Sequence, residues 1–424
     1  MLVMLVNIPY GKSFLQTDIS IERLEIATSQ SVETLKNLKE TVKQSLKRPI
    51  NSQPLHLILG KGKKICVIIP DETRGCPTKE ILSPVLQEIE SCKPNKIELL
   101  IGNGLHRGMS KEEMMESLGK NIVEKYNVTN HSATDERQLI DLKKKTSYGT
   151  PGILNKIAVE SDFVLGIGLV EPHFFAGFSG GRKTILPAIA GKEAILNNHS
   201  YNMIKSPYAS YGKMKGNPIH HDMIEFMNFV NLAFIINISI NKKMETTQIF
   251  AGDPYEAHEQ AVKFVNTYGK VRIHGAPDIV IVSNGGYPLD RDLYQSVKGI
   301  ATASNVVTEK GVIIMVAKCK DGLGGHKEFM KLMQKGTSPG EVLKEIKEEE
   351  PIVDQWQAQI LSKILIKTNV IVVTDGVKRN IIEKMMMSQV FSLEEALDSA
   401  REMVLTDKPR ILVIPEGPYI MPYF

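Results

Sequence analysis

The sequence has few cysteines and lacks any long apolar run, and these two absences narrow the class of protein. Its four cysteines show neither the CxxC spacing of metal and redox sites nor the density of a disulfide framework. The apolar opening, residues 1–6, has no basic leader and is too short to span a membrane. We therefore expect free thiols, a cytoplasmic location and no membrane partner.

Long blocks of one charge are also absent. The chain has 52 Lys and Arg against 48 Asp and Glu, a net charge of +4, and the two signs are interspersed. The short runs at 143–145 (KKK) and 348–350 (EEE) are most simply solvated helix ends or loops. We therefore do not expect nucleic acid as a partner.

Two common nucleotide-binding motifs are missing. Neither the Walker A pattern GxxxxGK[ST] nor the dinucleotide fingerprint GxGxxG occurs in the sequence. These absences count against ATP as a ligand. They also count against a conventional NAD-dependent dehydrogenase of hydroxy acids, although such an enzyme would share the histidines and cations described below.

Short β-branched runs alternate with longer helical patterns from about residue 64 onward. This alternation predicts an α/β protein with largely parallel sheets. The predicted strands are 64–70, 96–101, 162–170, 233–240, 278–283, 311–319, 369–374 and 410–415.

The length of 424 residues exceeds what one hydrophobic core normally covers, so we expect two domains with the active site in the cleft between them. Residues 268–278 combine Gly, His and Pro before a new apolar strand, which suits a linker. We predict an N-terminal domain over 1–270 and a C-terminal domain over 276–394. The tail 395–424 is a candidate to return to the first domain.

Polar residues gather directly after the first three predicted strands, where ligands bind in open parallel sheets. The three segments are Asp71–Gly75 (DETRG), Gly102–Gly108 (GNGLHRG) and Glu171–Lys183 (EPHFFAGFSGGRK). One such segment alone would be interpreted as a helix N-cap or a structural histidine. Three in succession that offer arginine, histidine, and histidine with lysine predict one converging site.

The end of the third segment, GFSGGRK, contains three glycines that we expect to open a helix. Glycines allow backbone N–H groups to approach an anion closely, and Ser179 and Arg182 lie beside them. We therefore expect this stretch to bind a phosphate, with the DETR segment as the alternative.

The second domain has a comparable stretch after its first strand. Residues 285–290 (GGYPLD) precede a helix that we expect from about residue 292, and this helix carries Tyr294, Gln295 and Lys298. Tyr294 and Lys298 share one helix face because they are four residues apart. Gln295 and Lys298 can offer an amide and an ammonium group to one carboxylate.

Together these stretches resemble the nickel-dependent lactate racemase family. The resemblance is carried, in order through both predicted domains, by DETR, GNGLHRGM, EPHFFAGFSGGRKTILP, the later His199, NGGYPLD and YQSVK. The third motif is long and highly specific. One departure is Leu105, where the family would have a Thr-like residue, and it bears on pocket shape rather than on the chemistry.

The resemblance implies a cofactor in the interdomain cleft, the nickel pincer nucleotide, which is a pyridinium mononucleotide with two thiocarboxyl-derived arms. Separate biosynthetic proteins would supply it. His199 would bind the nickel, Lys183 would be the covalent tether, and His106 and His173 would act as acid and base. The resemblance implies cofactor contacts at Asp71, Glu72, Thr73 and Arg74. From the glycine run we also expect cofactor contacts at Ser179, Gly180, Gly181 and Arg182. Substrate contacts are implied at Tyr294, Gln295, Lys298 and Trp356.

The implied reaction has a simple chemical reason. Removal of the Cα proton of a 2-hydroxy acid is difficult because the adjacent carboxylate stabilises a carbanion poorly. Loss of hydride together with the hydroxyl proton gives a neutral ketone, and hydride can return to either face. Histidine, with an unperturbed pKa of about 6.5, can serve as base and as acid.

We therefore expect a lactate racemase that interconverts D- and L-lactate through pyruvate. The alternative is a racemase or epimerase of another 2-hydroxy acid, such as malate, an aromatic hydroxy acid or a sugar acid. A more distant alternative is a non-catalytic nickel- or nucleotide-binding protein.

Overall fold

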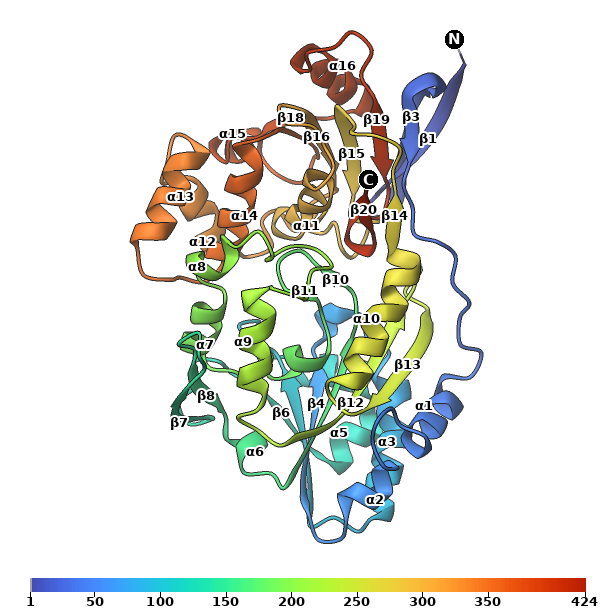
Figure 1. Cartoon of the computed structure of the whole chain (residues 1–424), viewed down its shortest axis with the longest axis vertical. Coiled ribbons are helices and arrows are strands. Elements are labelled where there is room, and N and C mark those ends of the chain that lie inside the picture. Colours follow the sequence, from blue (N-terminus) through green and yellow to red (C-terminus); the bar gives the residue numbers. More distant parts are fainter. Residues whose placement is uncertain (1) are drawn as a thin grey trace. The chain divides into compact units, whose positions relative to one another are not determined.

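The computed structural model describes residues 2–424, apart from the side chain of Arg74, and the elements are labelled in Figure 1. The chain divides into two compact units. Unit 1 comprises the residues up to 30, 200–207 and 268–424, and unit 2 comprises 31–199 and 208–267. No helix among residues 2–424 is both long and apolar enough to cross a membrane.

Unit 2 is built on a six-stranded sheet in the order β13-β12-β9-β4-β5-β6. Every neighbouring pair is parallel except β12 and β13. The central strands are buried on both faces, which explains their continuous Ile, Leu and Val runs. The strands are β4 (Lys64–Pro70), β5 (Lys96–Gly102), β6 (Asn127–Asn130), β9 (Phe163–Leu169), β12 (Leu232–Ile240) and β13 (Thr246–Gly252).

The strand order in unit 2 determines where a ligand can bind. The chain passes from β4 to β5 and β6 in one direction, and then returns to the other side of β4 with β9. This reversal creates a topological switch point between β4 and β9, at whose carboxyl ends ligands bind in open α/β sheets.

Helices and small hairpins complete unit 2. The helix α3 shows the typical amphipathic pattern, because its buried Ile81, Leu82, Val85, Leu86 and Ile89 form one stripe. The helices are α1 (Leu38–Lys47), α2 (Leu55–Leu59), α3 (Thr78–Ser91), α4 (Lys111–Leu118), α5 (Lys120–Lys125), α6 (Lys156–Val159), α7 (Lys192–Asn198), α9 (Pro218–Met227) and α10 (Glu256–Gly269), with the 3-10 turns η2 (Glu72–Arg74) and η3 (Gly181–Thr184). The hairpins are β7 (Leu139–Lys145) with β8 (Pro151–Asn155) and β10 (Pro172–His173) with β11 (Gly177–Phe178).

Unit 1 has a second six-stranded sheet, in the order β18-β17-β16-β15-β19-β3, and all its pairs are parallel. Its strands are β3 (Leu24–Ile26), β15 (Ile279–Ser283), β16 (Val312–Val316), β17 (Asn369–Val373), β18 (Ser388–Val390) and β19 (Ile411–Ile414). A separate pair is formed by β14 (Lys270–Arg272) and β20 (Met421–Tyr423). All eight strands predicted from the sequence are present in the two sheets, and the predicted α/β class with largely parallel sheets is confirmed.

One face of the unit 1 sheet is covered by the opening residues of the chain. The strands β1 (Val3–Tyr10) and β2 (Ser13–Ser20) form a hairpin. Val6, Ile8 and Tyr10 of this hairpin, at the two-residue period of a strand, join α16 and the sheet in one core. From the apolar opening, Val6 therefore joins this core, whereas residues 2–5 are exposed.

The helices of unit 1 lie on both faces of its sheet, since α16 contacts β16 and β17 whereas α11 contacts β15 and β16. They are α8 (Tyr201–Ile204), α11 (Leu293–Ser304), α12 (Lys327–Met333), α13 (Pro339–Glu348), α14 (Gln355–Leu365), α15 (Arg379–Lys384) and α16 (Leu393–Met403), with the turns η1 (Ile21–Arg23) and η4 (Gly417–Tyr419).

The observed units differ from the predicted domains at both ends of the chain. Residues 2–30, assigned above to the N-terminal domain, belong to unit 1 because β3 pairs with β19. The tail 395–424 does not return to the N-terminal domain, because its strand β19 pairs with β15. Both differences arise from strand pairing between distant segments, which local sequence patterns do not encode.

A buried histidine of unit 2 makes the stability of the fold depend on pH. His131 follows β6, its Nε2 donates to the carbonyl of Ala190 at 3.0 Å, and its Nδ1 accepts from Asn155 Nδ2 at 3.1 Å. Burial lowers the pKa of His131 to about 4. The unfolded chain, with a histidine pKa of about 6.5, therefore takes up the proton first as the pH falls.

We predict that His131 contributes stability fully above pH 6.5 and loses it between about pH 6.5 and 4. About 2 kcal/mol of the free energy of unfolding should disappear between pH 7 and pH 5 through this residue. His131→Gln, which keeps a donor near the Nε2 position, should flatten that decline in urea unfolding curves, whereas the exposed His221→Gln should not. An unchanged decline in His131→Gln would contradict the assignment.

Candidate active site

The carboxyl ends of β4, β5 and β9 bring the first candidate residues to the switch point of unit 2. Asp71 follows β4, His106 lies in the loop after β5, and His173 follows β9. Since β4 pairs in parallel with both β5 and β9, these three ends are neighbours.

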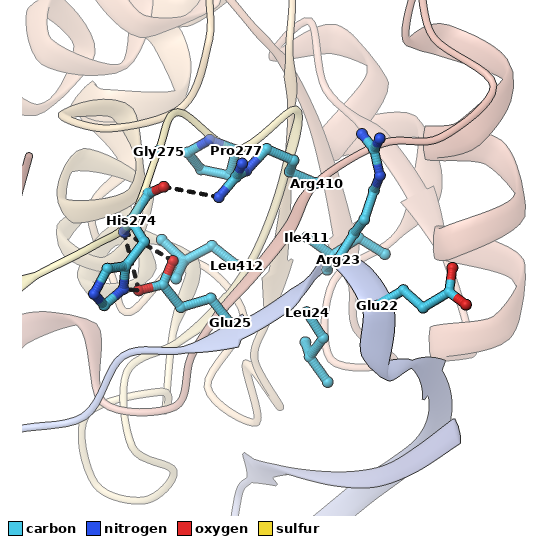
Figure 2. Close-up of a pocket in the computed structure, with 10 residues that line it drawn as sticks. All are labelled: Glu22, Arg23, Leu24, Glu25, His274, Gly275, Pro277, Arg410, Ile411 and Leu412. Carbon is cyan, nitrogen blue, oxygen red and sulfur yellow. Dashed lines mark hydrogen bonds and ion pairs between the residues drawn. The ribbon is translucent and has the colours of Figure 1, made fainter. Parts of the chain in front are cut away.

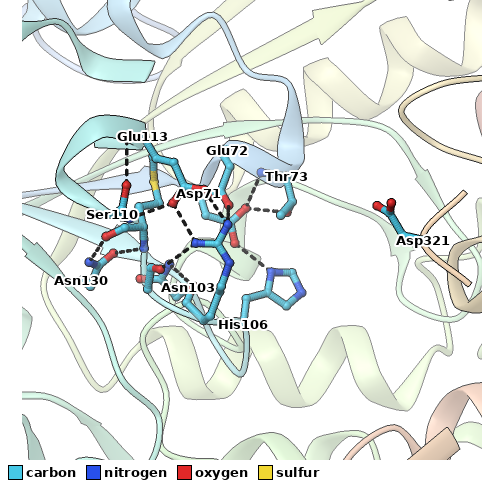
Figure 3. A network of polar contacts seen from close by, with 12 residues as sticks. Asp71, Glu72, Thr73, Asn103, His106, Ser110, Glu113, Asn130 and Asp321 are labelled. Atoms are coloured by element: carbon cyan, nitrogen blue, oxygen red, sulfur yellow. Dashed lines mark hydrogen bonds and ion pairs between the residues drawn. The ribbon is translucent and has the colours of Figure 1, made fainter. Parts of the chain in front are cut away.

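Asp71 orients His106, as Figure 3 shows. His106 Nδ1 lies 2.8 Å from Asp71 Oδ2, so the imidazole N–H donates to the carboxylate. The other carboxylate oxygen accepts from the backbone N–H and the hydroxyl of Thr73, at 3.1 and 2.5 Å. Asp71 is buried, whereas the His106 side chain is 38% exposed. With its proton held at Nδ1, neutral His106 presents a lone pair at Nε2, as a general base requires.

The loop that carries His106 is fixed by hydrogen bonds on both sides (Figure 3). The His106 N–H donates to the Asn103 carbonyl at 2.9 Å, and Asn103 Nδ2 donates to the Arg107 carbonyl at 3.1 Å. The Arg107 guanidinium pairs with both oxygens of Glu113, at 2.7 and 2.5 Å. Glu113 and Ser110 also form a capping box at the start of α4. These contacts restrict the position of the His106 ring.

His173 lies on the β10–β11 hairpin and faces Lys183. Its Nδ1 accepts from the backbone N–H of Ala176 at 3.2 Å and of Phe175 at 3.5 Å, and its Nε2 lies 3.3 Å from Lys183 Nζ. Since Nδ1 accepts, neutral His173 carries its proton on Nε2. Lys183 Nζ therefore lies within hydrogen-bond distance of the His173 ring. The uncharged amine is the nucleophilic form of lysine.

The ring of Phe175 brings His173, Lys183 and His199 together. Its centroid lies 4.5 Å from that of His173 and 5.0 Å from that of His199, and Lys183 Nζ is 5.7 Å from it. His199 ends α7 and is only 5% exposed. Burial, with a contribution from the charge of Lys183, lowers the pKa of His199 well below its usual range. His199 is therefore a neutral imidazole, the form that binds a metal.

The glycine run before Lys183 differs from the expectation of a phosphate-binding helix start. It leads into the single turn η3 rather than a helix. A Cβ on Gly180 (φ +76°) would lie 2.6 Å from Asn237 Oδ1, and one on Gly181 (φ +52°) 2.6 Å from His258 Cγ. The Gly181 N–H donates to Asn237, and Ser179 Oγ donates to the Leu169 carbonyl. The residues Ser179, Gly180 and Gly181 are therefore explained by close packing within the chain.

Arg182 is likewise packed within the chain, and a phosphate contact of its side chain stays a prediction. It is 1% exposed, and its guanidinium donates to the carbonyls of Ala176 at 2.7 Å and Gly180 at 3.4 Å. Burial lowers its pKa to about 9. By bridging two carbonyls of one loop, Arg182 clamps the segment between His173 and Lys183.

The DETR segment serves mainly to hold His106. Asp71 and Thr73 form the contacts described above, and Glu72 Oε1 lies 3.5 Å from the Arg107 guanidinium. The side chain of Arg74 lies outside the part of the chain that the structure describes.

The predicted substrate residues lie in unit 1. Asp292 caps α11 by accepting from the Gln295 N–H at 2.7 Å, so Tyr294, Gln295 and Lys298 lie in its first turns. Tyr294 is buried, which raises the pKa of its phenol well above the usual range, whereas Gln295 and Lys298 are half-buried. Trp356 Nε1 donates to Tyr294 Oη at 2.9 Å. The structure thus brings Tyr294 and Trp356 into contact.

A cavity of about 460 Å³ in unit 1 lies elsewhere (Figure 2). Its lining residues include Leu24, Pro277 and Arg410, which stand at the amino ends of β3, β15 and β19. None of the predicted site residues lines it. Because ligands of parallel sheets bind at the carboxyl ends, this cavity is not the candidate active site.

Comparison with known proteins agrees with this geometry. The family model for the lactate racemase N-terminal domain matches residues 10–212, and that for the lactate racemase C-terminal domain matches residues 273–421. The lactate racemase of Thermoanaerobacterium thermosaccharolyticum is 40% identical over 421 residues, which cover 97% of each chain. The chain belongs to the lactate racemase family. The resemblance found in the sequence motifs is thereby confirmed.

A second relative and two solved structures extend the comparison of this lactate racemase family member. The lactate racemase of Lactiplantibacillus plantarum is 36% identical over 97% of this chain and 98% of its own. The structure of the lactate racemase apoprotein from T. thermosaccharolyticum superimposes with a TM-score of 0.92 at 37% identity, covering 99% of this chain and all of the other. A protein of Thermotoga maritima has a TM-score of 0.70 at 17% identity, covers 94% of this chain and 100% of its own, and shares the fold alone.

The sequence singled out the histidines but did not predict the side chains that orient them. The pairing of Asp71 with His106, and the clamp formed by Arg182, depend on contacts between separate loops. It also gave no role to His326, which pairs with Asp354 in unit 1. A signal was present, because His326 follows the glycine-rich stretch 322–325 after β16, much as His106 follows glycines after β5.

We predict that Asp71→Asn reduces the racemase activity of the cofactor-loaded chain about 10²- to 10⁴-fold in kcat, as for the comparable aspartate of a serine protease. The side-chain amide of Asp71→Asn would donate to His106 Nδ1, so the ring proton would move to Nε2. His106 Nε2 would then lack the lone pair that a base needs. Chiral analysis of the product gives kcat, and circular dichroism checks the fold. Glu88→Gln, which changes the Nδ1 partner of the surface His56, is the matched control. A native kcat in Asp71→Asn would refute the role.

Proposed function

We propose that this chain is a lactate racemase that interconverts D- and L-lactate through pyruvate, with a nickel pincer nucleotide as its cofactor. The observation that carries the proposal is the gathering of His173, Lys183 and His199 around Phe175, next along the sheet from the Asp71–His106 pair. Family membership supports a racemase of a small hydroxy acid. The cofactor and the residue roles are our inference from this site.

The two histidines are suited to move the hydroxyl proton. His106 Nε2 carries a lone pair and takes the proton from the 2-hydroxyl group of one enantiomer. His173 presents an N–H at Nε2 in the neutral ring, and it gives a proton to the substrate oxygen from its protonated, imidazolium form. The two side chains thus begin with opposite hydrogen-bonding roles at Nε2.

The residues in unit 2 fit the proposed cofactor. Lys183, whose Nζ lies 3.3 Å from His173 Nε2, provides the nucleophile for a covalent tether, and His199 provides a buried neutral nitrogen for nickel. The bound cofactor supplies the site that accepts a hydride from Cα and returns it. Phe174 and Phe175, both buried, exclude water from these groups.

The residues in unit 1 are suited to bind the substrate anion. Lys298 and Gln295, one helical turn apart on α11, offer an ammonium and an amide to the carboxylate. Trp356 and Tyr294 present aromatic surface for a small side chain. This small apolar wall favours lactate over malate, aromatic hydroxy acids and sugar acids, which remain the alternative substrates.

Loading with the cofactor requires separate biosynthetic proteins, which we propose as partners. All four cysteines are free thiols. Free thiols support a reducing compartment, so we propose that the reaction takes place in the cytoplasm.

The test is intact-protein mass and nickel content after co-production with the pincer biosynthesis enzymes. We expect a mass increment of nucleotide size and about one nickel per chain, because Lys183 and His199 hold the group. Lys183→Ala should lose the increment, and His199→Ala should lose nickel. Purified loaded chain should then racemise D-lactate.

The exposed Lys192→Ala and His221→Ala serve as matched controls and should retain both increment and nickel. The L. plantarum relative serves as the positive control for loading. If this chain keeps its unmodified mass and contains no nickel while the relative is loaded, the proposal is refuted and a non-catalytic role is favoured.

A further inference from the structure

Unit 1 contains a histidine–carboxylate pair next to the proposed substrate residues. His326 immediately precedes α12, and its Nδ1 lies 2.9 Å from Asp354 Oδ2. The carboxylate is buried, whereas the His326 side chain is 25% exposed. Such a pair fixes the ring orientation and leaves the opposite ring edge near solvent.

The ring of His326 is stacked on Tyr294. The two centroids are 3.5 Å apart and the planes differ by only 6°. Phe329, on α12, contacts the Tyr294 ring edge-to-face at 5.6 Å and 84°. The phenol ring is therefore held from two sides by residues that follow β16.

Asp354 lies between His326 and the hydroxyl end of Tyr294. The carboxylate is within electrostatic range of the phenol, whose oxygen accepts a hydrogen bond from Trp356 Nε1. Asp354 stands at the start of α14 in a left-handed backbone conformation, with φ at +66°. This conformation is uncommon for a residue other than glycine, so the carboxylate is directed by its backbone as well as by its partners.

The same cluster includes the residues proposed for the substrate anion. Asp292, buried at the start of α11, lies within electrostatic range of both His326 and Lys298, and it accepts from the Gln295 N–H. His326 therefore belongs to the group of side chains around Asp292 that contains Lys298 and Gln295.

We propose that His326 is a positioning residue for substrate binding, an inference that rests on the proposed function. Oriented by Asp354 and stacked on the phenol, it fixes the ring plane of Tyr294, and through the Tyr294 hydroxyl it fixes the indole of Trp356. These two rings form the wall against which the side chain of a 2-hydroxy acid packs. Loss of His326 weakens binding of the substrate rather than the chemical step.

The single tryptophan of the chain provides a direct readout of this network, because Trp356 is the only indole and is bonded to Tyr294. We expect His326→Leu to shift the fluorescence emission of the cofactor-free chain. His326→Asn, whose amide can replace Nδ1 as donor to Asp354, should restore the native emission. Addition of L-lactate should change the emission of the native chain and of His326→Asn at lower concentration than that of His326→Leu.

Steady-state kinetics of the loaded enzyme separate binding from chemistry. We expect His326→Leu and Asp354→Asn to raise the KM for lactate about tenfold or more with kcat within about threefold, since uniform binding is lost. His326→Asn should remain within about threefold of the native KM. His274→Leu is the matched control, because His274 pairs with Glu25 at 2.9 Å through the same ring nitrogen but is 80% exposed.

The outcomes distinguish this inference from the proposed function. A native loaded enzyme that racemises lactate, with native KM and emission in His326→Leu, would overturn the inference and leave the function intact. Equal damage in His326→Asn and His326→Leu would also overturn it, because a donor at the Nδ1 position would then not matter. A native loaded enzyme without racemase activity would refute the function, and the emission comparison would still decide whether His326 holds Tyr294.

Discussion

The parallel pairing of β4 with β5 and β9 is the constraint on which the proposed site of unit 2 depends. Pro70 of β4 lies opposite Gly102 of β5, so the two strands end level and Asp71 comes beside the loop of His106. A strand rises about 3.3 Å per residue, so a register slip of two residues would displace Asp71 by about 6–7 Å. Such a slip is more than twice the 2.8 Å bond between Asp71 and His106. The buried apolar runs of these strands therefore determine the geometry of the proposed site as well as the core.

The segment from His173 to Lys183 shows how a loop is made rigid without a helix. Arg182 is buried and charged, and isolated buried charges are strongly unfavourable unless their donors are satisfied. Here the two terminal nitrogens donate to the carbonyls of Ala176 and Gly180, so the guanidinium closes the loop on itself, whereas Nε has no hydrogen-bond partner. The cost of desolvation is reflected in its lowered pKa of about 9. Gly180 and Gly181 are needed because Asn237 and His258 occupy the space of any Cβ.

The sequence was sufficient to predict the strands and which residues follow them, because both depend on local hydrophobic periodicity. The eight predicted strands and the start of α11 are all present. It could not predict that residues 2–30 pair with the last part of the chain, because β3 and β19 are nearly 400 residues apart in the sequence and meet only in the folded sheet. For the same reason it assigned Arg182 and the glycines to a phosphate site and gave no sign of their close packing. Their burial follows from Asn237 and His258, which come from segments beyond the motif.

Three histidines of this chain illustrate how a neighbouring group decides the role of an imidazole. Asp71 accepts from Nδ1 of His106 and leaves a basic nitrogen at Nε2. At His173 backbone amides donate to Nδ1, so the neutral ring has a donor at Nε2 instead. His326 has a carboxylate partner like that of His106. Its ring, however, is stacked on Tyr294, so the phenol covers one face of the imidazole.

The residue type is the same in all three cases, so the sequence alone cannot distinguish the proposed base, acid and positioning residue. The hydrogen-bond partner of Nδ1 separates His106 from His173, and the stacking on Tyr294 separates His326 from His106. The proposed reaction needs a proton acceptor when the hydroxy acid is converted to pyruvate and a proton donor when pyruvate is converted back, and the loops around His106 and His173 offer one Nε2 of each kind. The asymmetry between His106 and His173 is thus a consequence of the loops, and it precedes any cofactor or substrate.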